Sequence, residues 1–231
     1  MTDRPTTVED AVLSRHSVRA FSDRPVPRET VERLLGLAAR SASNSNSQPW
    51  HVYVLTGDRK DRLTRALWAA LDEGRSATDP RYGYQPPPGE WEEPFRSRRS
   101  DFGRGLYHDT LGIARDDRDG RAAHHRRNYA FFGAPVGLII TVSADLGAGA
   151  FVDAGLFLQA LMLLARAEGL DTCAQASFVD FDPVIRGELA IPDDRIIVCG
   201  ISLGYADDTE RVNAFRSDRE PLDAVATFVG E

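Results

Sequence analysis

The sequence predicts one layered domain of the α/β or α+β class, because strand and helix patterns alternate along it. Residues 135–143 and 195–203 have the pattern of buried strands, rich in Val, Leu and Ile. Between them, residues 151–168 have the length of a helix and are apolar nearly all round, so this helix needs cover on every side. A sizeable core is expected, since a chain of 231 residues buries roughly 70% of its unfolded surface.

The remaining elements follow from local signals. A capping box at Thr6–Glu9 begins a helix that continues to about Ser14. Pro27 begins a second helix, in which apolar residues recur at the i, i+3, i+4 and i+7 spacing. The other expected elements are helices over 58–73 and 182–189 and extended segments over 18–21, 51–56 and 171–178.

A long loop is predicted for about 75–95, which contains five prolines and two glycines. A loop of this length is either a functional lid or a disordered segment. Because core-forming strands lie on both sides of it, residues 1–231 are expected to form a single domain. Charged helical stretches are expected to follow over about 95–131.

Composition narrows the class of protein. The net charge of −7 argues against nucleic acid and anionic membranes as partners. Cys173 and Cys199 are the only cysteines, too few for a disulfide framework. The first ten residues lack the pattern of a signal peptide, and the longest uninterrupted apolar run, 160–165, is far shorter than the roughly 20 residues of a membrane span. We therefore expect a cytoplasmic protein.

Three possible functional motifs are excluded by the residues around them in the sequence. Gly200–Gly204 matches the G-x-S-x-G nucleophile elbow, but no histidine follows its serine in the chain. Gly147–Gly149 is part of a dinucleotide-binding fingerprint, yet Val152 occupies the position of its third glycine. No two histidines have the i, i+4 spacing of a helical metal site, so no metal ion is expected.

Three separated polar segments make chemical sense together as a site for flavin mononucleotide (FMN). The phosphate dianion favours arginine, whose guanidinium group offers several donors in a rigid plane. Arg15–Arg19 contains two arginines four residues apart, and Arg216 and Arg219 follow late in the chain. The Ser- and Asn-rich stretch 41–48 offers donors and acceptors for a ribityl chain and a pyrimidine edge. Each segment also has an ordinary interpretation as surface arginines, a polar loop or a solvated tail.

These segments resemble those of the FMN-dependent nitroreductase family. The resemblance rests on Ser14–Phe21 followed by Ser43–Trp50, on 153–178, and on the strand that ends at Gly204 with the closing 216–222. It implies an α+β fold with a central mixed sheet and helices on both faces. It also implies an intertwined homodimer with two FMN sites at its interface, in which the partner subunit covers the apolar helix.

The resemblance implies a set of cofactor-binding residues and no catalytic acid or base. These are Arg15, His16, Ser17, Arg19, Arg216 and Arg219 for the phosphate and pyrimidine edge, Ser43, Asn46 and Gln48 from the other subunit, and Gln175, Ala176 and Ser177 beside flavin N5 and O4. A cation such as Arg19 would stabilise the negative charge of a reduced flavin. Ala42 replaces the family's proline in the loop, which leaves Ser41 as a rival to Ser43.

The activity implied is reduction of a nitroaromatic, quinone or related acceptor in two-electron steps, with NADH or NADPH as donor in a ping-pong mechanism. Two alternatives remain open: another flavin reaction on this scaffold, such as dehydrogenation, dehalogenation or flavin fragmentation, and a non-catalytic flavin-binding protein. Aromatic residues in or after the loop could stack on the substrate or simply pack. These are Tyr82, Tyr84, Trp91, Phe95, Phe102 and Tyr107.

Overall fold

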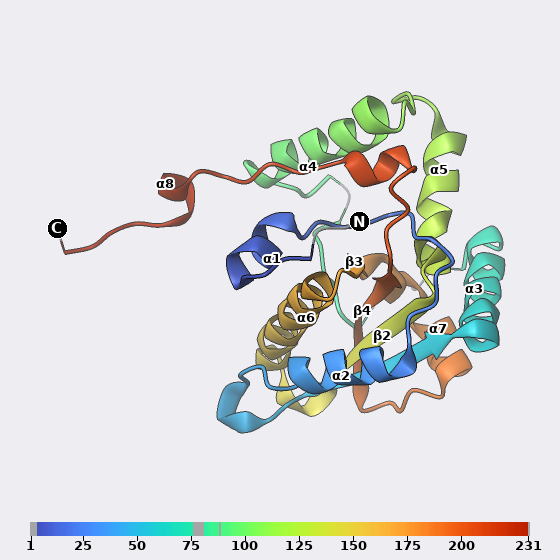
Figure 1. Cartoon of the computed structure of the whole chain (residues 1–231). Helices are drawn as coiled ribbons and strands as arrows, with labels where there is room; N and C mark the ends of the chain where they lie inside the picture. Colours follow the sequence, from blue (N-terminus) through green and yellow to red (C-terminus); the bar gives the residue numbers. More distant parts are fainter. Residues whose placement is uncertain (1–3, 76–80, 88, 231) are drawn as a thin grey trace.

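The computed structural model describes residues 4–75, 81–87 and 89–230, with a four-stranded sheet at its centre (Figure 1). The strands are β1 (Trp50–Thr56), β2 (Val136–Ser143), β3 (Asp171–Gln175) and β4 (Arg195–Gly204). Their order is β1-β2-β4-β3, and all three neighbouring pairs are antiparallel. The sheet is therefore antiparallel where a mixed one was predicted. Parallel pairing in the described residues is limited to a bridge between Ser17 and Thr172, too short for a ladder.

Helices cover both faces of the sheet, which confirms the predicted fold class (Figure 1). Leu138 and Ile140 of β2 pack with the apolar residues of α2 and α6, whereas Ile139 packs with those of α3 on the opposite face. Successive side chains of a strand point to opposite faces, so this one strand serves both cores. The helices concerned are α1 (Val8–Ser14), α2 (Arg28–Ala38), α3 (Gly57–Asp72), α6 (Gly149–Ala167) and α7 (Asp182–Leu189).

The apolar helix α6 is only partly covered. Phe157 and Leu161 are buried, but Val152 and Leu156 expose 68% and 48% of their surface. By length and composition alone α6 could cross a membrane, a test that core helices of soluble proteins also pass, and 33% of its most apolar stretch is buried within the chain. The described residues of this chain leave the rest of this apolar surface exposed.

The Pro-rich loop and the helices after it agree with the prediction as far as they are described. Residues 75, 81–87 and 89–94 contain no helix or strand, while 76–80 and 88 lie outside the described residues. The chain is then helical in short pieces. These are α4 (Phe95–Gly103), the π-helix η2 (Arg104–Thr110), α5 (Arg118–Arg126) and the 3-10 segment η3 (Arg127–Gly133).

The N-cap of α1 differs from the prediction, and the G-x-S-x-G stretch has a structural role in β4. Thr7 rather than Thr6 caps α1, and its reciprocal partner is the Asp10 carboxylate, three residues further on. The G-x-S-x-G stretch lies inside β4, where the fully buried Ser202 hydroxyl donates to Gln175 Oε1 at 2.6 Å, so it is a core hydrogen bond and no nucleophile.

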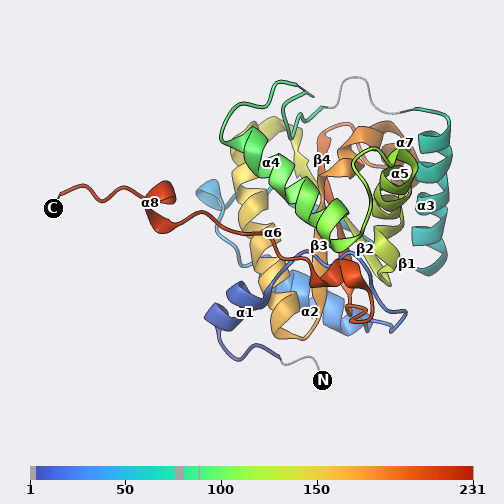
Figure 2. The same ribbon diagram turned by 90° about the horizontal axis from the view of Figure 1, so that it is seen from above.

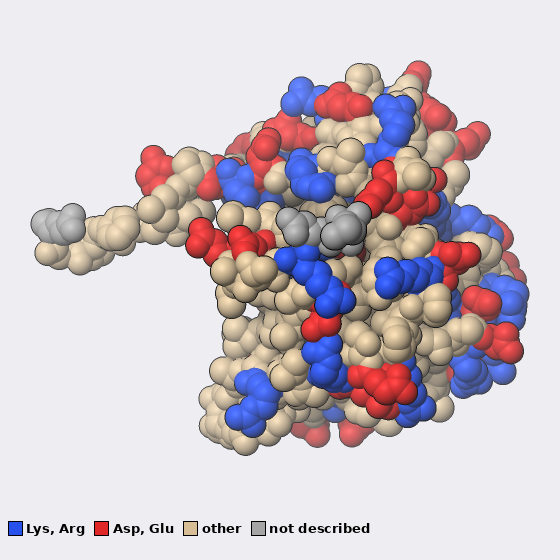
Figure 3. All heavy atoms as spheres, in the orientation of Figure 1, with Lys and Arg blue, Asp and Glu red and all other residues tan. Residues whose placement is uncertain are grey.

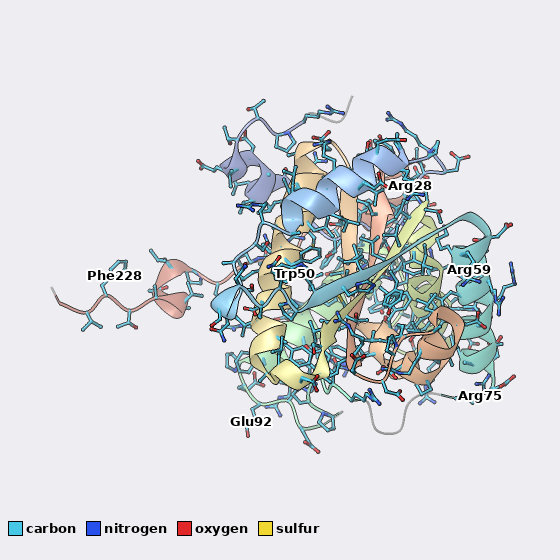
Figure 4. All side chains as sticks on the ribbon, turned by 90° about the horizontal axis from the view of Figure 1, so that it is seen from below. Arg28, Trp50, Arg59, Arg75, Glu92 and Phe228 are labelled. Carbon is cyan, nitrogen blue, oxygen red and sulfur yellow. The ribbon has the colours of Figure 1, made fainter. Side chains whose placement is uncertain are left out.

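The chain ends in a segment that projects from the body in both ribbon views (Figures 1 and 2). It contains the short helix α8, and Phe228 near its end exposes 74% of its surface. Figure 4 shows the Phe228 ring far from the sheet. The remaining short elements are η1 (Asn44–Asn46), η4 (Ala144–Leu146), η5 (Ala176–Phe181), η6 (Arg211–Ala214) and α8 (Leu222–Val225).

Candidate functional site

The N-terminal arginine segment lies along the edge strand β3. The Val18 N–H donates to the Thr172 carbonyl at 3.1 Å, and Ser17 forms the parallel bridge to the same residue. Val18 and Ala20 are buried, and alternate side chains of an extended chain point in opposite directions. The intervening Ser17 and Arg19 consequently point outward, into a cleft.

The C-terminal arginine segment forms the other side of this cleft. Arg216 Nη1 donates to the carbonyls of Asn213 and Phe215 at 2.7 and 3.0 Å. Arg219 Nη1 donates to the Ser217 carbonyl and hydroxyl at 3.0 and 2.8 Å. A guanidinium group has five N–H donors, so both arginines keep donors for a ligand.

The cleft between the two segments has a volume of about 550 Å³, a size typical of small-molecule sites. Phe102 and Phe215 form an edge-to-face ring pair in its wall, with centroids 5.3 Å apart. The Arg19 guanidinium carbon lies 5.6 Å from the centre of the Phe102 ring. The lining residues are Val12, Leu13, Arg15, His16, Ser17, Arg19, Phe102, Phe215, Arg216, Ser217 and Arg219.

The charge of the cleft is one-sided. Arg15, Arg19, Arg216 and Arg219 line it, and none of them forms an ion pair with a carboxylate in the described part of the chain. Burial and, next, the nearby Arg219 guanidinium lower the pKa of Arg15. Elsewhere acidic and basic side chains alternate over the visible surface (Figure 3). Converging cations without acidic partners are the arrangement expected of an anion site.

A buried ion pair supports the cleft at His16. Arg166 and Asp171 lie 3.3 Å apart, and Arg166 Nε donates to the Ser14 hydroxyl at 3.2 Å. His16 Nδ1 is 3.1 Å from the Ser14 carbonyl. Burial lowers the pKa of His16 and raises that of Asp171. Burial therefore favours the neutral form of the His16 ring, which lines the cleft among the arginines.

The Ser- and Asn-rich loop lies on a different surface, against the first half of α6. The Asp153 carboxylate, only 6% exposed, anchors it from below. The Asn44 N–H lies 3.2 Å from both oxygens of this carboxylate, and the Ser47 hydroxyl donates to it at 3.3 Å. Its negative charge is thus balanced by donors of the loop, which fixes the loop to α6.

The loop backbone is strained at its tip. Ser45, Asn46 and Gln48 have φ angles of 50°, 57° and 46°, in the left-handed region that costs non-glycine residues free energy. The Gln48 N–H donates to Ser43 Oγ at 3.0 Å, which helps to hold this shape. Asn46 and Gln48 are exposed and do not line the cleft of their own chain. That they contact the flavin of a second subunit stays a prediction.

The segment after β3 is the third predicted part of the site, and it too lies outside the lining of the cleft. The Gln175 side chain is 3% exposed and holds the core together, accepting from Ser202 and donating from Nε2 to the Asn128 carbonyl at 2.8 Å. Only its backbone is left for a ligand. Ala176 and Ser177 are half-buried at the start of η5.

Of the aromatic candidates, Phe102 lines the cleft, and others have packing roles. Tyr82 stacks on Phe151 with centroids 4.3 Å apart, and Tyr107 lies edge-on to His124. Trp91 and Phe95 pack beneath the guanidinium groups of Arg99 and Arg98, and burial raises the pKa of Tyr84. Sequence reasoning missed Phe215, Asn213 and Asp153, of which only Phe215 carries a sequence signal, as an aromatic residue beside Arg216.

The chain is similar in sequence to known nitroreductases. The model of the Nitroreductase family matches residues 12–205. A 4-nitrobenzoate reductase of Nocardioides sp. (strain LMS-CY) is 51% identical over 95% of this chain and 89% of its own length. The chloronitrobenzene nitroreductase of Comamonas testosteroni is 41% identical over 97% of each chain.

A solved structure agrees in fold. The FMN-dependent nitroreductase NfnB from Mycobacterium smegmatis, in complex with NADPH, superposes with a TM-score of 0.90, covering 96% of this chain and 97% of that one at 37% identity. The fold and the sequence matches together define an FMN-type oxidoreductase scaffold. The chain belongs to the nitroreductase family, which confirms the resemblance drawn from its sequence.

Proposed function

We propose that this protein reduces nitroaromatic compounds in two-electron steps, with NADH or NADPH as electron donor and FMN as bound cofactor. The observation that carries the proposal is the cleft in which Arg15, Arg19, Arg216 and Arg219 converge without a carboxylate partner in the described residues. The relatives named above are nitroreductases, and NfnB is FMN-dependent and was solved with NADPH. These relatives support the predicted enzyme class.

The donor set of the cleft fits FMN. Arg15, Arg216 and Arg219, with the Ser17 hydroxyl, would hold the terminal phosphate through charge-assisted hydrogen bonds. Arg19 lies at the same wall beside Phe102, where its charge would balance the negative charge of a reduced flavin. Bound FMN supplies the redox chemistry between nicotinamide and nitroarene, and the chain supplies binding, orientation and electrostatics.

A second copy of the chain completes the site in this proposal. The exposed side chains of α6, Val152 and Leu156, lie on the helix that anchors the Ser/Asn-rich loop, so cover of α6 by a second copy would carry that loop to a neighbouring cleft. Ser43, Asn46 and Gln48 would then contact the flavin of the other subunit. The projecting C-terminal segment has no charged residue over 224–230 and would gain cover in the same dimer.

We assign the substrate as a nitroarene and include nitroarenes that carry a carboxylate. Two curated relatives are 4-nitrobenzoate reductases, and others act on nitrobenzene or chloronitrobenzene by name. Surplus positive charge in the cleft favours an anionic substrate over a neutral one of equal size. A cytoplasmic location follows from the use of NAD(P)H as the electron donor.

Purified protein tests the proposal directly. We expect the visible absorbance of a bound flavin, release of FMN on denaturation, and NAD(P)H-dependent reduction of 4-nitrobenzoate and nitrobenzene. Bound flavin that neither nicotinamide reduces would favour another flavin reaction or flavin storage. A colourless protein that does not bind added FMN would contradict the proposal entirely.

A further inference from the structure

One buried amide joins the two arginine segments of the cleft. Asn213 is 7% exposed, and its side chain makes four hydrogen bonds to main-chain groups. Oδ1 accepts from the N–H groups of Arg19 and Ala20 at 2.8 and 3.2 Å. Nδ2 donates to the carbonyls of Ala20 and Asp207 at 2.7 and 2.9 Å. An amide side chain has two donor hydrogens and two acceptor lone pairs, so every one of them is used.

These bonds connect the N-terminal arginine segment to the C-terminal one beside the cleft. On the N-terminal side, one of the N–H groups that donate to Asn213 belongs to Arg19, which lines the cleft. On the other side, the carbonyl of Asn213 accepts from Arg216 Nη1 at 2.7 Å. Asn213 therefore touches both arginine segments, one through its side chain and the other through its own backbone.

The fold does not depend on this side chain alone. The Asp207 N–H donates to the Ala20 carbonyl at 3.0 Å, and Phe21 forms an antiparallel bridge with Ala206. Val212 beside Asn213 is buried against Ala20 and Leu106. Without Asn213 the two segments would still meet through these contacts, but the register of the arginines across the cleft would lose its four hydrogen bonds.

We infer that Asn213 is a positioning residue for the cofactor phosphate, setting the distance between the arginines of the two segments. The inference rests on the proposed function, because it takes the anion in the cleft to be the phosphate of FMN. A phosphate held by several guanidinium groups at once is sensitive to small changes in their spacing. The oxidised isoalloxazine ring carries no charge, so its binding should depend much less than that of the phosphate on the spacing of the guanidinium groups.

The comparison of FMN with riboflavin, which lacks the phosphate, separates positioning from general destabilisation. In Asn213→Leu the affinity of the flavin-free full-length protein for FMN is expected to fall about 10- to 100-fold, the effect of losing one charge-assisted contact. Its affinity for riboflavin should stay within about twofold. Asn213→Ala, which removes the same four hydrogen bonds without adding charge or bulk, should show the same selective loss of FMN affinity.

Both dissociation constants are measured by quenching of flavin fluorescence, together with the melting temperature of each flavin-free protein. Thr141→Val is the matched control. Thr141 lies on β2, two strands away from β3, and its buried hydroxyl donates to the His51 carbonyl of β1 and accepts from Arg195 Nε of β4. Its removal should leave the FMN-to-riboflavin affinity ratio unchanged.

The outcomes distinguish the proposed phosphate site from the positioning role of Asn213. A wild-type protein that binds riboflavin as tightly as FMN overturns the proposed phosphate site itself, whatever the variants do. If wild type prefers FMN, but the variants lose affinity for both flavins in equal proportion or for neither, Asn213 has no positioning role. Should Asn213→Leu not fold, the smaller and uncharged Asn213→Ala decides, with the same affinity ratio as the readout.

Discussion

The arginine cleft and the Ser/Asn-rich loop differ in how their own chain holds them. The cleft is tied to the body from both sides, by the Val18–Thr172 hydrogen bond and by the four bonds of Asn213. The loop is tied to one helix through Asp153, while its left-handed tip at Asn46 faces solvent. The cleft is held entirely within the chain, whereas the loop has the side chains predicted to contact the flavin on a surface with no partner among the described residues.

A cofactor site built from one chain alone would be incomplete on the side of the flavin ring. A single chain has the cations for a phosphate, but the polar side chains suited to a flavin lie outside that cleft. Backbone strain at an exposed tip persists when surrounding contacts or a function require it. The phosphate half should therefore respond to changes at the cleft, and the loop half to changes at α6.

The largest effect is expected for Leu156→Arg on the exposed face of α6. A buried, unpaired charge costs several kcal/mol, enough to separate two subunits that pack on this helix. We expect a monomer without flavin, seen by sedimentation and by loss of visible absorbance. Asp61→Arg, on an exposed position of α3 across the sheet, is the control and should stay dimeric. A Leu156→Arg monomer that keeps its flavin would break the comparison.

The next effect is expected for Arg15→Ala in the cleft. Loss of one charge-assisted contact to the phosphate is worth about 1.5–3 kcal/mol, so FMN affinity should fall about 10- to 150-fold while the dimer persists. Titration with FMN measures this loss. Arg59→Ala, an exposed arginine on α3 labelled in Figure 4, is the matched control without an effect on affinity. Full retention of tightly bound flavin in Arg15→Ala would contradict the site assignment.

Local sequence patterns predicted the layered class of the fold and the arginine segments of the cleft, whereas the particular fold was implied by the family resemblance. The alternation in 18–21 and the apolar run of β2 depend on neighbours along the chain, so periodicity predicts them. Arg15, Arg19 and Arg216 were predictable because each segment is rich in arginine. The structure places all three in the lining of one cleft.

The residues that sequence reasoning missed act only through distant partners. Asp153 is one acid in an apolar helix, and its role comes from the Asn44 N–H over a hundred residues earlier in the chain. Asn213 likewise has no local pattern, because its four partners come from Arg19, Ala20 and Asp207. The side-chain amide of Gln175 bonds Ser202 and Asn128 in the core, so the predicted flavin contact of this segment, through backbone N–H groups, stays a prediction.

A further effect concerns acid stability and depends on the buried His124. Burial, followed by nearby Arg127 and Arg19, lowers the pKa of His124 to about 4. The unfolded chain, with a histidine pKa of about 6.5, binds more protons between these values. The contribution of neutral His124 is therefore complete above pH 6.5 and is lost as the pH falls toward 4, by at most about 3 kcal/mol. Urea unfolding of the flavin-free protein at several pH values measures this loss.

His124→Phe isolates this contribution, because a phenyl ring keeps the packing against Tyr107 and Phe132 and does not titrate. The difference in unfolding free energy between wild type and variant should be constant above pH 7 and shift in favour of the variant below pH 6. A difference that is flat from pH 8 to pH 4 would show that His124 is not held neutral behind the cleft.

The smallest effect, and the sharpest test of the comparison, is expected for Asp153→Asn. The amide keeps one acceptor for the loop and loses the charge that strengthens the Asn44 and Ser47 hydrogen bonds, at a cost of about 1 kcal/mol. Because the loop would contact the flavin away from its phosphate, affinities for FMN and riboflavin should fall together, by about fivefold. Asn213 variants should lose FMN alone. If Asp153→Asn also lowers only the FMN affinity, the two regions do not divide the cofactor between them.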